Sequence, residues 1–336
     1  MKVWRDSLVG LIRLTLEKNR PVNSSDLRFG LIGAGRWGKV YIKTLERMDG
    51  FELVRLASTN PNAKKLVNSN CLITKDWRDV AKSDDLDGVI IATPPPLHAK
   101  MMRVALANSN PVLVEKPLTV DLLEAREILN FATKMSSIVH VDHTHLYHGA
   151  YRLLKSHGLN LGQVKEIDSC AGDWGPFRYD TNVLWDRGSH EVAMCLDLLS
   201  EYPESISANT NKKKHTDDGS GETISIHLIF SSGVRANLKI SNLLIDKKRD
   251  FYVHYEKETL FYNGIGEPAL SRTLKSGEIQ LIEVTDILPL DQVIIDFGAA
   301  IARGRSDLDG LRLGVNVVNV LQECQRSLLV DGSENL

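Results

Sequence analysis

A glycine string near the start of the chain restricts the fold more than any other feature. Gly33, Gly35 and Gly38 are spaced as G-x-G-x-x-G and directly follow a short apolar run, Leu27–Ile32. After the string, apolar residues recur at helical spacing as far as Gly50. A buried strand that ends in such a loop, with a helix that begins in it, is typical of a doubly wound parallel sheet. The sequence therefore predicts a binding site for the diphosphate of a dinucleotide at this loop, with an ordinary tight turn as the alternative.

Each glycine of the string has its own reason to lack a side chain. Gly33 permits the tight turn, Gly35 lets the backbone approach a diphosphate, and Gly38 allows the helix to pack closely on the strand. The free N–H groups and the positive dipole end of the helix then attract the anion. Arg36 could add a charge-assisted contact or could be solvated, and Trp37 completes the candidate cofactor loop.

The end of the second predicted strand bears on the choice between NAD and NADP. A carboxylate about 20 residues after the glycines usually binds the ribose diol of NAD. This sequence has Ser58, Thr59 and Asn60 there, which could hydrogen-bond either form of the ribose, and a lysine pair that could reach a phosphate follows them. Because no carboxylate would repel a 2′-phosphate, the sequence favours NADP slightly over NAD.

The first half of the chain alternates between apolar runs and helical patterns. Predicted strands are Leu27–Ile32, Leu53–Ala57, Gly88–Ala92, Val112–Val114 and Ile138–Val141. Predicted helices follow the glycine string, start near Asn62, and cover Leu97–Ala107 and Thr119–Met135. This order predicts an N-terminal Rossmann domain with a doubly wound parallel sheet.

The second half of the chain has mostly alternating patterns, such as Ile224–Ile229, Val234–Ile240 and Asp250–Tyr255. These predict a C-terminal α+β domain with a large, mostly antiparallel open sheet. Helices are expected over Val183–Leu199 and, as a pair, from Leu290 through Leu328, and the run Asn211–His215 is expected to be a charged loop. The predicted domains are a helical extension at 1–26, a dinucleotide-binding domain at 27–145 and a substrate-binding and oligomerisation domain at 146–330.

Composition excludes several classes of protein. Apolar residues make up 43% of the 336 residues and charged residues 25%, which excludes a mainly disordered chain. With 41 basic and 43 acidic residues, the net charge of -2 gives no reason to expect nucleic acid or a membrane as a partner. The four cysteines are far apart, which disfavours a disulfide framework or a cysteine zinc site and favours a cytoplasmic protein. The apolar stretch at residues 8–16 is expected to be an amphipathic helix packed on the body of the protein or on a second subunit, with a membrane-surface helix as the alternative.

A lysine follows one of the predicted parallel strands. Because the carboxyl ends of such strands face the ligand crevice, Thr93, Pro94, Glu115 and Lys116 should line the same edge as the glycine loop. Desolvation and the positive charge of a nicotinamide would lower the pKa of a lysine there, so that it could exchange a proton near neutrality. The alternative is a surface lysine paired with Glu115.

A second candidate group combines a carboxylate with an imidazole. Asp186 and His190 are four residues apart, so they share one face if they lie in a helical turn. A carboxylate can orient an imidazole and support its charged form for acid–base work, although a purely structural pair is the alternative. A dense histidine group lies elsewhere, but its members alternate along and beyond a strand and should not converge on a metal: His140, His143, His145 and His148.

Together these motifs resemble the Gfo/Idh/MocA family of oxidoreductases. The resemblance spans about Leu27 to Leu328 and rests on the glycine string, Ala92-Thr93-Pro94-Pro95-Pro96-Leu97-His98, Glu115-Lys116-Pro117 and Asp186-x-x-x-His190. It implies a Rossmann domain followed by an α/β domain whose open sheet often mediates homodimers or homotetramers. It also implies hydride transfer between NAD(P) and a hydroxyl or ketone of a sugar, inositol or sugar nucleotide.

The resemblance assigns roles by motif position. Lys116 matches the family's active-site lysine, and Asp186 and His190 match its aspartate and histidine. The segment beside the nicotinamide corresponds to Thr93, Pro94 and His98, with Glu115 preceding the lysine. His145 falls where relatives often have a residue that contacts substrate, and Arg187 could bind a carboxylate or phosphate of the substrate.

The sequence departs from the family pattern at two places, both of which concern the substrate pocket. Many members have an acidic residue where this chain has Ala193, and three glycines before the aspartate where it has Asn182–Trp185. Two other functions remain open: a nicotinamide-dependent glycoside hydrolase of the same family, and a regulatory protein that binds a dinucleotide without turnover. The presence of Lys116, Asp186 and His190 together argues against the second.

Overall fold

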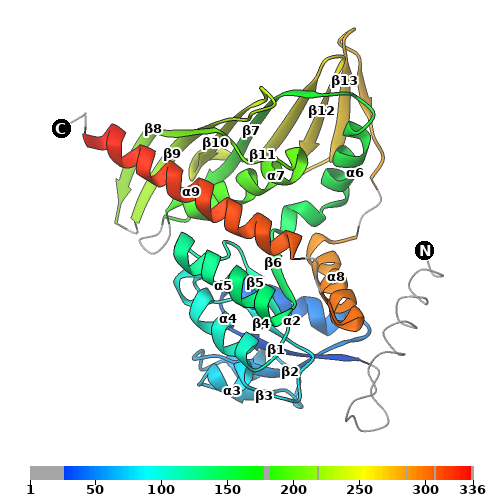
Figure 1. Cartoon of the computed structure of the whole chain (residues 1–336), viewed down its shortest axis with the longest axis vertical. Helices are drawn as coiled ribbons and strands as arrows, with labels where there is room; N and C mark the ends of the chain where they lie inside the picture. The colour runs from blue at the N-terminus through cyan, green and yellow to red at the C-terminus, as the bar shows by residue number, and fades with distance from the viewer. Residues whose placement is uncertain (1–25, 178–181, 218, 285–286, 306–307, 334–336) are drawn as a thin grey trace. The chain divides into compact units, whose positions relative to one another are not determined.

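The chain forms two compact units, which are described separately below (Figure 1). The computed structural model describes residues 26–177, 182–217, 219–284, 287–305 and 308–333. The first unit contains the described residues of Met1–Asp142 together with Leu290–Val315, and the second contains His143–Pro289 with Asn316–Leu336. The predicted N-terminal helix lies outside the described residues.

The first unit is built on a six-stranded sheet in which every pair of neighbours is parallel. The strand order is β3-β2-β1-β4-β5-β6, so the chain winds outward from β1 in both directions. This confirms the predicted doubly wound sheet. The strands are β1 (Leu27–Ile32), β2 (Phe51–Ala57), β3 (Leu72–Thr74), β4 (Gly88–Ile91), β5 (Val112–Glu115) and β6 (Val139–Asp142).

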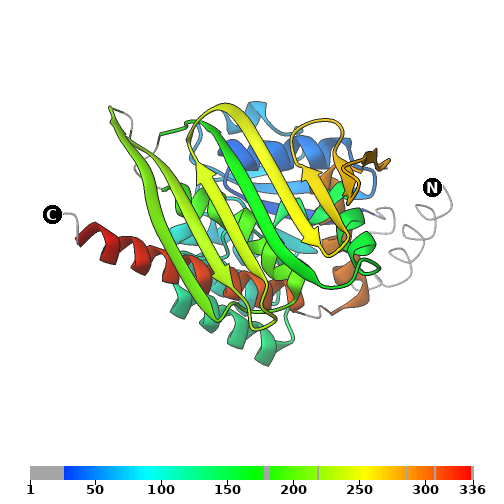
Figure 2. The same ribbon diagram turned by 90° about the horizontal axis from the view of Figure 1, so that it is seen from above.

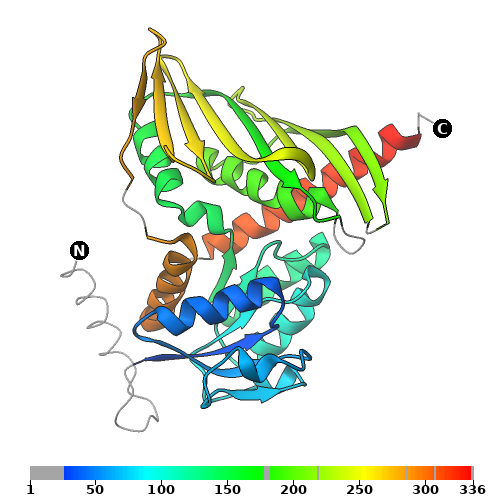
Figure 3. The same ribbon diagram turned by 180° about the vertical axis from the view of Figure 1, so that it is seen from behind.

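Helices cover both faces of this sheet: α4 and α5 lie on one side, and α2 and α8 on the other (Figures 1 and 3). Asp121 caps α5 by accepting a 2.9 Å hydrogen bond from the backbone N–H of Glu124. The helix expected near Asn62 is only a three-residue 3₁₀ turn, Ala63–Lys65. The helices are α2 (Arg36–Arg47), α3 (Arg78–Ala81), α4 (His98–Ala107), α5 (Leu122–Met135) and α8 (Pro289–Arg303).

Helix α8 joins the first unit although it comes late in the sequence. Its Phe297 stacks on Phe29 of β1 at a centroid distance of 5.7 Å, and Phe29 also stacks on Phe51 of β2 at 5.9 Å. All three rings lie against the sheet, and Gly298 leaves room for the ring of Phe51. Burial of these large apolar rings stabilises the packing of α8 on the first sheet.

The second unit is built on an eight-stranded sheet with the order β14-β13-β12-β11-β7-β10-β9-β8. Only β7 and β10 are parallel neighbours, so the sheet is mostly antiparallel, as predicted. The strands are β7 (Val164–Trp174), β8 (Ser205–Thr216), β9 (Gly219–Ile229), β10 (Arg235–Ser241), β11 (Leu243–Tyr255), β12 (Glu258–Asn263), β13 (Leu270–Leu274) and β14 (Ile279–Leu281).

One face of this sheet packs against helices and the other is uncovered within the described part of the chain (Figures 2 and 3). The covering helices are α6 (Gly149–Gly158), α7 (Ser189–Leu199) and the second-unit part of α9 (Asp309–Ser333). Alternation along β9 explains the two faces, because Ile224, Ile226 and Leu228 are buried while His227 and Ile229 are exposed.

One predicted loop is wrong. Asn211–His215, expected to be a charged loop, lies within β8 and pairs antiparallel with β9. Lysine at 212, 213 and 214 remains exposed because β8 is the last strand of the sheet, where charged side chains reach solvent and discourage further strand pairing. Within the described ranges, no helix has the length and apolar character needed to cross a bilayer.

Candidate functional site

The glycine loop has the geometry that its sequence predicts. Gly33 has a φ of +105°, and a Cβ there would lie 2.5 Å from the carbonyl oxygen of Ala92. A Cβ at Gly38 would lie 2.0 Å from the carbonyl oxygen of Gly33, so helix α2 can approach β1 only without that side chain. A Cβ at Gly35 would meet no described atom within 4 Å. The open space above Gly35 is where a ligand can approach the backbone.

The first turn of α2 faces this space. The helix begins at Arg36, its N-cap is Gly35, and neither a capping side chain nor an acidic residue of the described chain occupies its first turn. Its first N–H groups and its positive dipole end are therefore suited to an anion. Arg36 is exposed beside them. These features fit the diphosphate of a dinucleotide.

The loop after β2 is held by its own polar side chains. The Ser58 hydroxyl accepts a 3.1 Å hydrogen bond from the backbone N–H of Asn60, and the Asn60 side chain accepts one of 2.9 Å from the N–H of Asn62. Thr59 is exposed. The turn thus presents hydroxyl and amide groups, and no carboxylate, at the end of β2.

His98 ties together two loops at the carboxyl edge of the first sheet. Its ring is 0% exposed, with Nδ1 3.0 Å from the carbonyl oxygen of Pro117 and Nε2 2.8 Å from that of Thr93. Burial lowers the pKa of His98, although the backbone carbonyls oppose that effect. The structure therefore places His98 behind the loops that carry Thr93 and Lys116, while Pro94 is exposed in the first of them.

A buried acidic cluster lies beneath the predicted lysine. Glu115 and Asp142 are register partners at the ends of β5 and β6, and the Tyr41 hydroxyl donates a 2.5 Å hydrogen bond to Asp142 Oδ2. Burial raises the pKa of Glu115 well above its usual value, the neighbouring Asp142 raises it further, and Lys116 opposes both effects. The environment of Glu115 therefore favours the protonated form of its carboxyl group more than water does. Lys116, the next residue, is 8% exposed.

Tyr41 and Asp142 were not predicted from the sequence to belong to the site. A signal for Asp142 was present, because it directly follows the predicted strand Ile138–Val141 at the edge where the other strand ends meet. Nothing in the spacing of Tyr41 distinguishes it from an ordinary buried helix residue.

In the second unit, the Asp186 motif begins with a widened turn. Leu184–Gly188 is π-helical and leads directly into α7. The backbone N–H of Asp186 donates to the carbonyl oxygen of Asn182 at 3.1 Å, and His190 is 8% exposed one turn later. The predicted helix over Val183–Leu199 is therefore present, with an irregular first turn of the kind often found at functional sites.

His190 lies against a second imidazole. The rings of His190 and His145 are 4.8 Å apart between centroids and nearly perpendicular, at 89°. His145 comes from a 3₁₀ turn, Thr144–Tyr147, and its Nδ1 lies 3.1 Å from the hydroxyl of Tyr262 on β12. The structure therefore brings together two of the sequence-predicted residues and adds Tyr262, which the sequence did not indicate.

Arg187 is engaged within its own unit. Its guanidinium pairs with Asp173 and donates a 3.2 Å hydrogen bond to the carbonyl oxygen of Gly175, and 14% of its side chain is exposed. Much of its charge is therefore used to hold the end of β7. Its predicted contact with a substrate anion remains a prediction.

A buried ion pair fixes α7 to the sheet. Arg249 of β11 donates a 2.8 Å hydrogen bond to Glu191, which also accepts one from the hydroxyl of Ser169 on β7. Burial raises the pKa of Glu191, and Arg249 opposes this. Since Glu191 adjoins His190, this pair sets the position of the helix turn that carries the imidazole.

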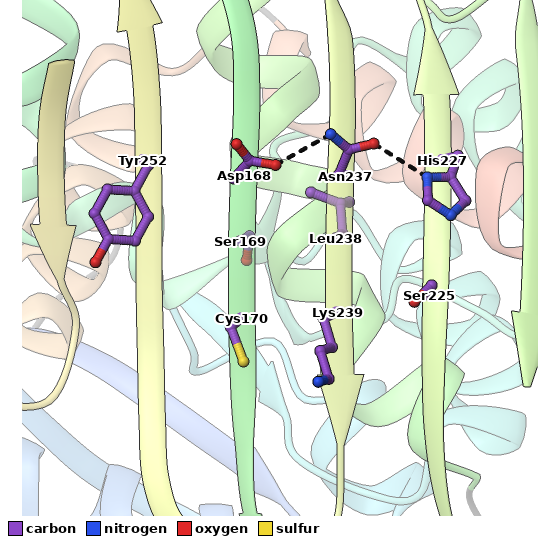
Figure 4. A pocket seen from close by; sticks show the side chains of 9 residues that line it. All are labelled: Asp168, Ser169, Cys170, Ser225, His227, Asn237, Leu238, Lys239 and Tyr252. Atoms are coloured by element: carbon purple, nitrogen blue, oxygen red, sulfur yellow. Dashed lines mark hydrogen bonds between the residues drawn. The ribbon is translucent and has the colours of Figure 1, made fainter. Parts of the chain in front are cut away.

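The uncovered sheet face carries a shallow hollow of about 260 Å³ that is separate from α7 (Figure 4). A row of polar side chains crosses it: Asn237 donates to Asp168 at 3.1 Å, and its Oδ1 lies 3.1 Å from Nδ1 of His227. Tyr252 borders the hollow and stacks on Phe261 at a centroid distance of 4.4 Å. Among the described residues, no group of three or more histidine, cysteine or acidic side chains is placed to hold a metal.

The predicted site residues thus divide between the units. The glycine loop, the turn after β2, Thr93, His98, Glu115 and Lys116 belong to the first unit. His145, Asp186, Arg187 and His190 belong to the second.

Comparison with family models matches both halves of the chain. Residues 27–143 match the family described as "Oxidoreductase family, NAD-binding Rossmann fold", and residues 157–261 match the "GFO/IDH/MocA C-terminal domain". The two matches include the sequence-predicted site residues except His145, which lies between the matched ranges.

Among curated proteins, an inositol 2-dehydrogenase from Rhodococcus jostii (strain RHA1) is 27% identical over 281 residues, which cover 76% of each chain. An inositol 2-dehydrogenase from Rhizobium meliloti (strain 1021) is 25% identical over 224 residues, or 62% of this chain and 67% of that protein. Among solved structures, a protein from Magnetospirillum magnetotacticum MS-1 is 37% identical with a TM-score of 0.83, covering 89% of this chain and 99% of that one. The UDP-N-acetylglucosamine 3-dehydrogenase of Acidithiobacillus ferrooxidans shares the fold, with a TM-score of 0.79 and 20% identity over 90% of this chain and 98% of that one.

Proposed function

Since the chain belongs to the Gfo/Idh/MocA family of NAD-binding oxidoreductases, we propose that it transfers a hydride between NAD(P) and a hydroxyl or ketone of an inositol, a sugar or a sugar nucleotide. The observation that carries this proposal is the combination of the open Gly35 loop with Lys116 at the end of β5. The named activities of the inositol dehydrogenase relatives support the choice of a polyol-like substrate.

The cofactor would be held by the residues of the glycine loop and the neighbouring strand ends. The N–H groups of the first turn of α2 bind the diphosphate, and Arg36 adds a positive charge. Thr93 and Pro94 flank the nicotinamide half, and His98 fixes the loop in which they lie. When bound, the nicotinamide accepts or donates the hydride.

Three side chains would serve the reaction. In oxidation, His190 accepts the proton of the substrate hydroxyl as the hydride leaves its carbon, and a ketone results. Lys116 donates a hydrogen bond to the reacting oxygen and stabilises the negative charge that develops there. Asp186 orients His190 and favours its charged form. Reduction follows the same steps in the opposite order.

For the cofactor, we propose NADP with a modest preference over NAD. Ser58, Thr59 and Asn60 offer hydrogen bonds without a carboxylate that would repel a 2′-phosphate. Fluorescence titration of the protein with NADPH and NADH should give the lower dissociation constant for NADPH, and tighter binding of NADH would contradict the preference.

We also propose that the uncovered sheet face associates with the same face of a second copy, in a homodimer or homotetramer. The exposed ring of Tyr252 and the half-buried ring of Phe261 supply apolar area. Asp168 and Lys239 supply opposite charges that can pair across a two-fold axis. The family resemblance supports this arrangement.

The proposed activity is tested with a panel of inositols, sugars and sugar nucleotides, each supplied with NAD⁺ and NADP⁺ and followed by nicotinamide absorbance. Stoichiometric reduction of the cofactor with at least one polyol is expected. Hydrolysis of a glycoside with only catalytic cofactor would identify a glycosidase instead. Tight cofactor binding with no turnover on any member of the panel would favour a regulatory role.

A further inference from the structure

Tyr262 of β12 belongs to none of the sequence motifs, yet it lies beside His145, one of the predicted site residues. Its side chain is 0% exposed on the covered face of the sheet. Within the described part of the chain, its hydroxyl makes a single hydrogen bond, at 3.1 Å to Nδ1 of His145. The rings of His148 and Tyr151 pack edge-on against it at centroid distances of 5.2 and 6.2 Å. These contacts hold the hydroxyl of Tyr262 against Nδ1 of His145.

The direction of this hydrogen bond follows from burial. Burial raises the pKa of Tyr262 well above its usual value, so the hydroxyl keeps its proton. A buried O–H that finds no acceptor loses free energy, and Nδ1 of His145 is the acceptor within reach. Tyr262 therefore donates, and Nδ1 of His145 accepts.

The accepted hydrogen bond decides where His145 carries its own proton. A neutral imidazole has one N–H and one lone pair, so an accepting Nδ1 leaves the proton on Nε2. The lone pair of His145 is then occupied by Tyr262 and is not available to take a proton from a substrate. The ring of His190 is perpendicular to that of His145, at a centroid distance of 4.8 Å.

We propose that Tyr262 is a positioning residue that holds His145 as an Nε2–H hydrogen-bond donor beside His190. His145 then donates to a substrate oxygen on the carbon next to the reacting one, while His190 exchanges the proton of the reacting hydroxyl. The two adjacent imidazoles thus have different tasks, and the site favours substrates with two neighbouring oxygens. The part that concerns substrate rests on the proposed function, whereas the tautomer of His145 does not.

The tautomer is tested on the full-length protein labelled with ¹⁵N-histidine. Long-range ¹H–¹⁵N spectra at a pH where imidazoles are neutral should show Nδ1 of His145 unprotonated and Nε2 protonated, with the signals assigned by their loss in His145→Gln. In Tyr262→Phe the ¹⁵N shifts should move toward a mixture of tautomers. In the matched control Tyr151→Phe, which also removes a buried hydroxyl from this unit, they should not move. A protonated Nδ1 in the unaltered protein would overturn the assignment, whatever the enzyme's substrate is.

The substrate contact is tested by kinetics with the best member of the panel described above. Tyr262→Phe should lower kcat/KM about tenfold, and His145→Gln combined with it should lower kcat/KM little further, because both remove the same donor. Tyr151→Phe should have a much smaller effect. Equal losses in the two tyrosine variants would overturn the contact with substrate and leave the tautomer result standing. If no member of the panel reacts, the proposed function fails and the spectra still decide the tautomer.

Discussion

The hydroxyl of Tyr41 lies 2.5 Å from Oδ2 of Asp142, although the two residues are 101 positions apart. The contact joins α2, the helix that starts at the glycine loop, to the end of β6. Through Asp142 it also reaches Glu115, the residue before Lys116. One buried polar cluster thus connects the helix that follows the glycine loop to the strand end that precedes the predicted catalytic lysine.

Replacement of Tyr41 by phenylalanine tests this cluster. The ring would still fill its place, but the buried Asp142 would lose its donor, so the free energy of unfolding should fall by about 1–3 kcal/mol. Urea denaturation measures the change, with Tyr252→Phe, whose tyrosine is partly exposed, as the control. Equal stability of the two variants would show that the hydrogen bond contributes nothing measurable.

Glu115→Gln should change how stability depends on pH. The folded-state pKa of Glu115 is raised above its usual value of 4.5, so the folded protein binds a proton that the unfolded chain releases. The stabilisation from this group is complete below pH 4.5 and is lost as the pH rises through the raised value. In chemical denaturation, the wild-type protein should therefore lose stability relative to Glu115→Gln as the pH rises from 4.5 through the raised pKa. Glu52→Gln, at an exposed position of β2, should show no such trend.

Lys116→Met should lower turnover at least about 100-fold while leaving binding of the dinucleotide measurable, because the variant loses the group that we propose contacts the reacting oxygen. The control is Lys100→Met, on the exposed side of α4. Initial rates and a cofactor titration separate the two effects. Turnover close to that of the unaltered protein would remove Lys116 from the mechanism.

Two variants of the glycine loop should separate an effect on cofactor binding from an effect on stability. Gly35→Ala places a methyl group in open space, so stability should stay within about 1 kcal/mol. Binding of NADPH should weaken about tenfold or more, because the methyl group blocks the diphosphate. Gly38→Ala forces a methyl group to 2.0 Å from a backbone oxygen and should destabilise the fold by about 3 kcal/mol or more. Unfolding curves and titrations distinguish the two variants, and normal cofactor binding by Gly35→Ala would contradict the assigned role.

Tyr252→Glu should dissociate the proposed assembly. The new charge would replace the exposed Tyr252 ring that stacks on Phe261 at the sheet face, so light scattering after size exclusion should show a smaller species. Leu123→Glu, at an exposed position of α5, should leave the mass unchanged. Loss of association in the α5 variant alone would point to a different interface.

Local patterns were sufficient for most of the first unit, because each buried strand and helix has its own apolar signature. Elements of three or four residues, such as β3 and α3, are too short to show a periodicity. The run Asn211–His215 misled the sequence analysis because an edge strand can carry charges that a central strand cannot.

The motif residues of the candidate site were predicted from the sequence. The buried residues that hold them in place were not. Gly33, Gly38, Glu115 and the two histidines at 145 and 190 carry recognisable chemistry in their motifs. The groups that hold them have no signature of their own. Tyr41, Arg249 and Tyr262 resemble ordinary buried or half-buried residues until the fold brings a partner to them.

The sequence alone determined the class of this protein, because a strand, a glycine loop and a helix encode a diphosphate site within a few consecutive residues. Tertiary structure decided which groups are buried together: Phe297 against Phe29, Tyr41 against Asp142, and Tyr262 against His145. Backbone preferences act between near neighbours in the chain, whereas burial and charge act between neighbours in space. The protonation state of each buried group is therefore set by the folded chain.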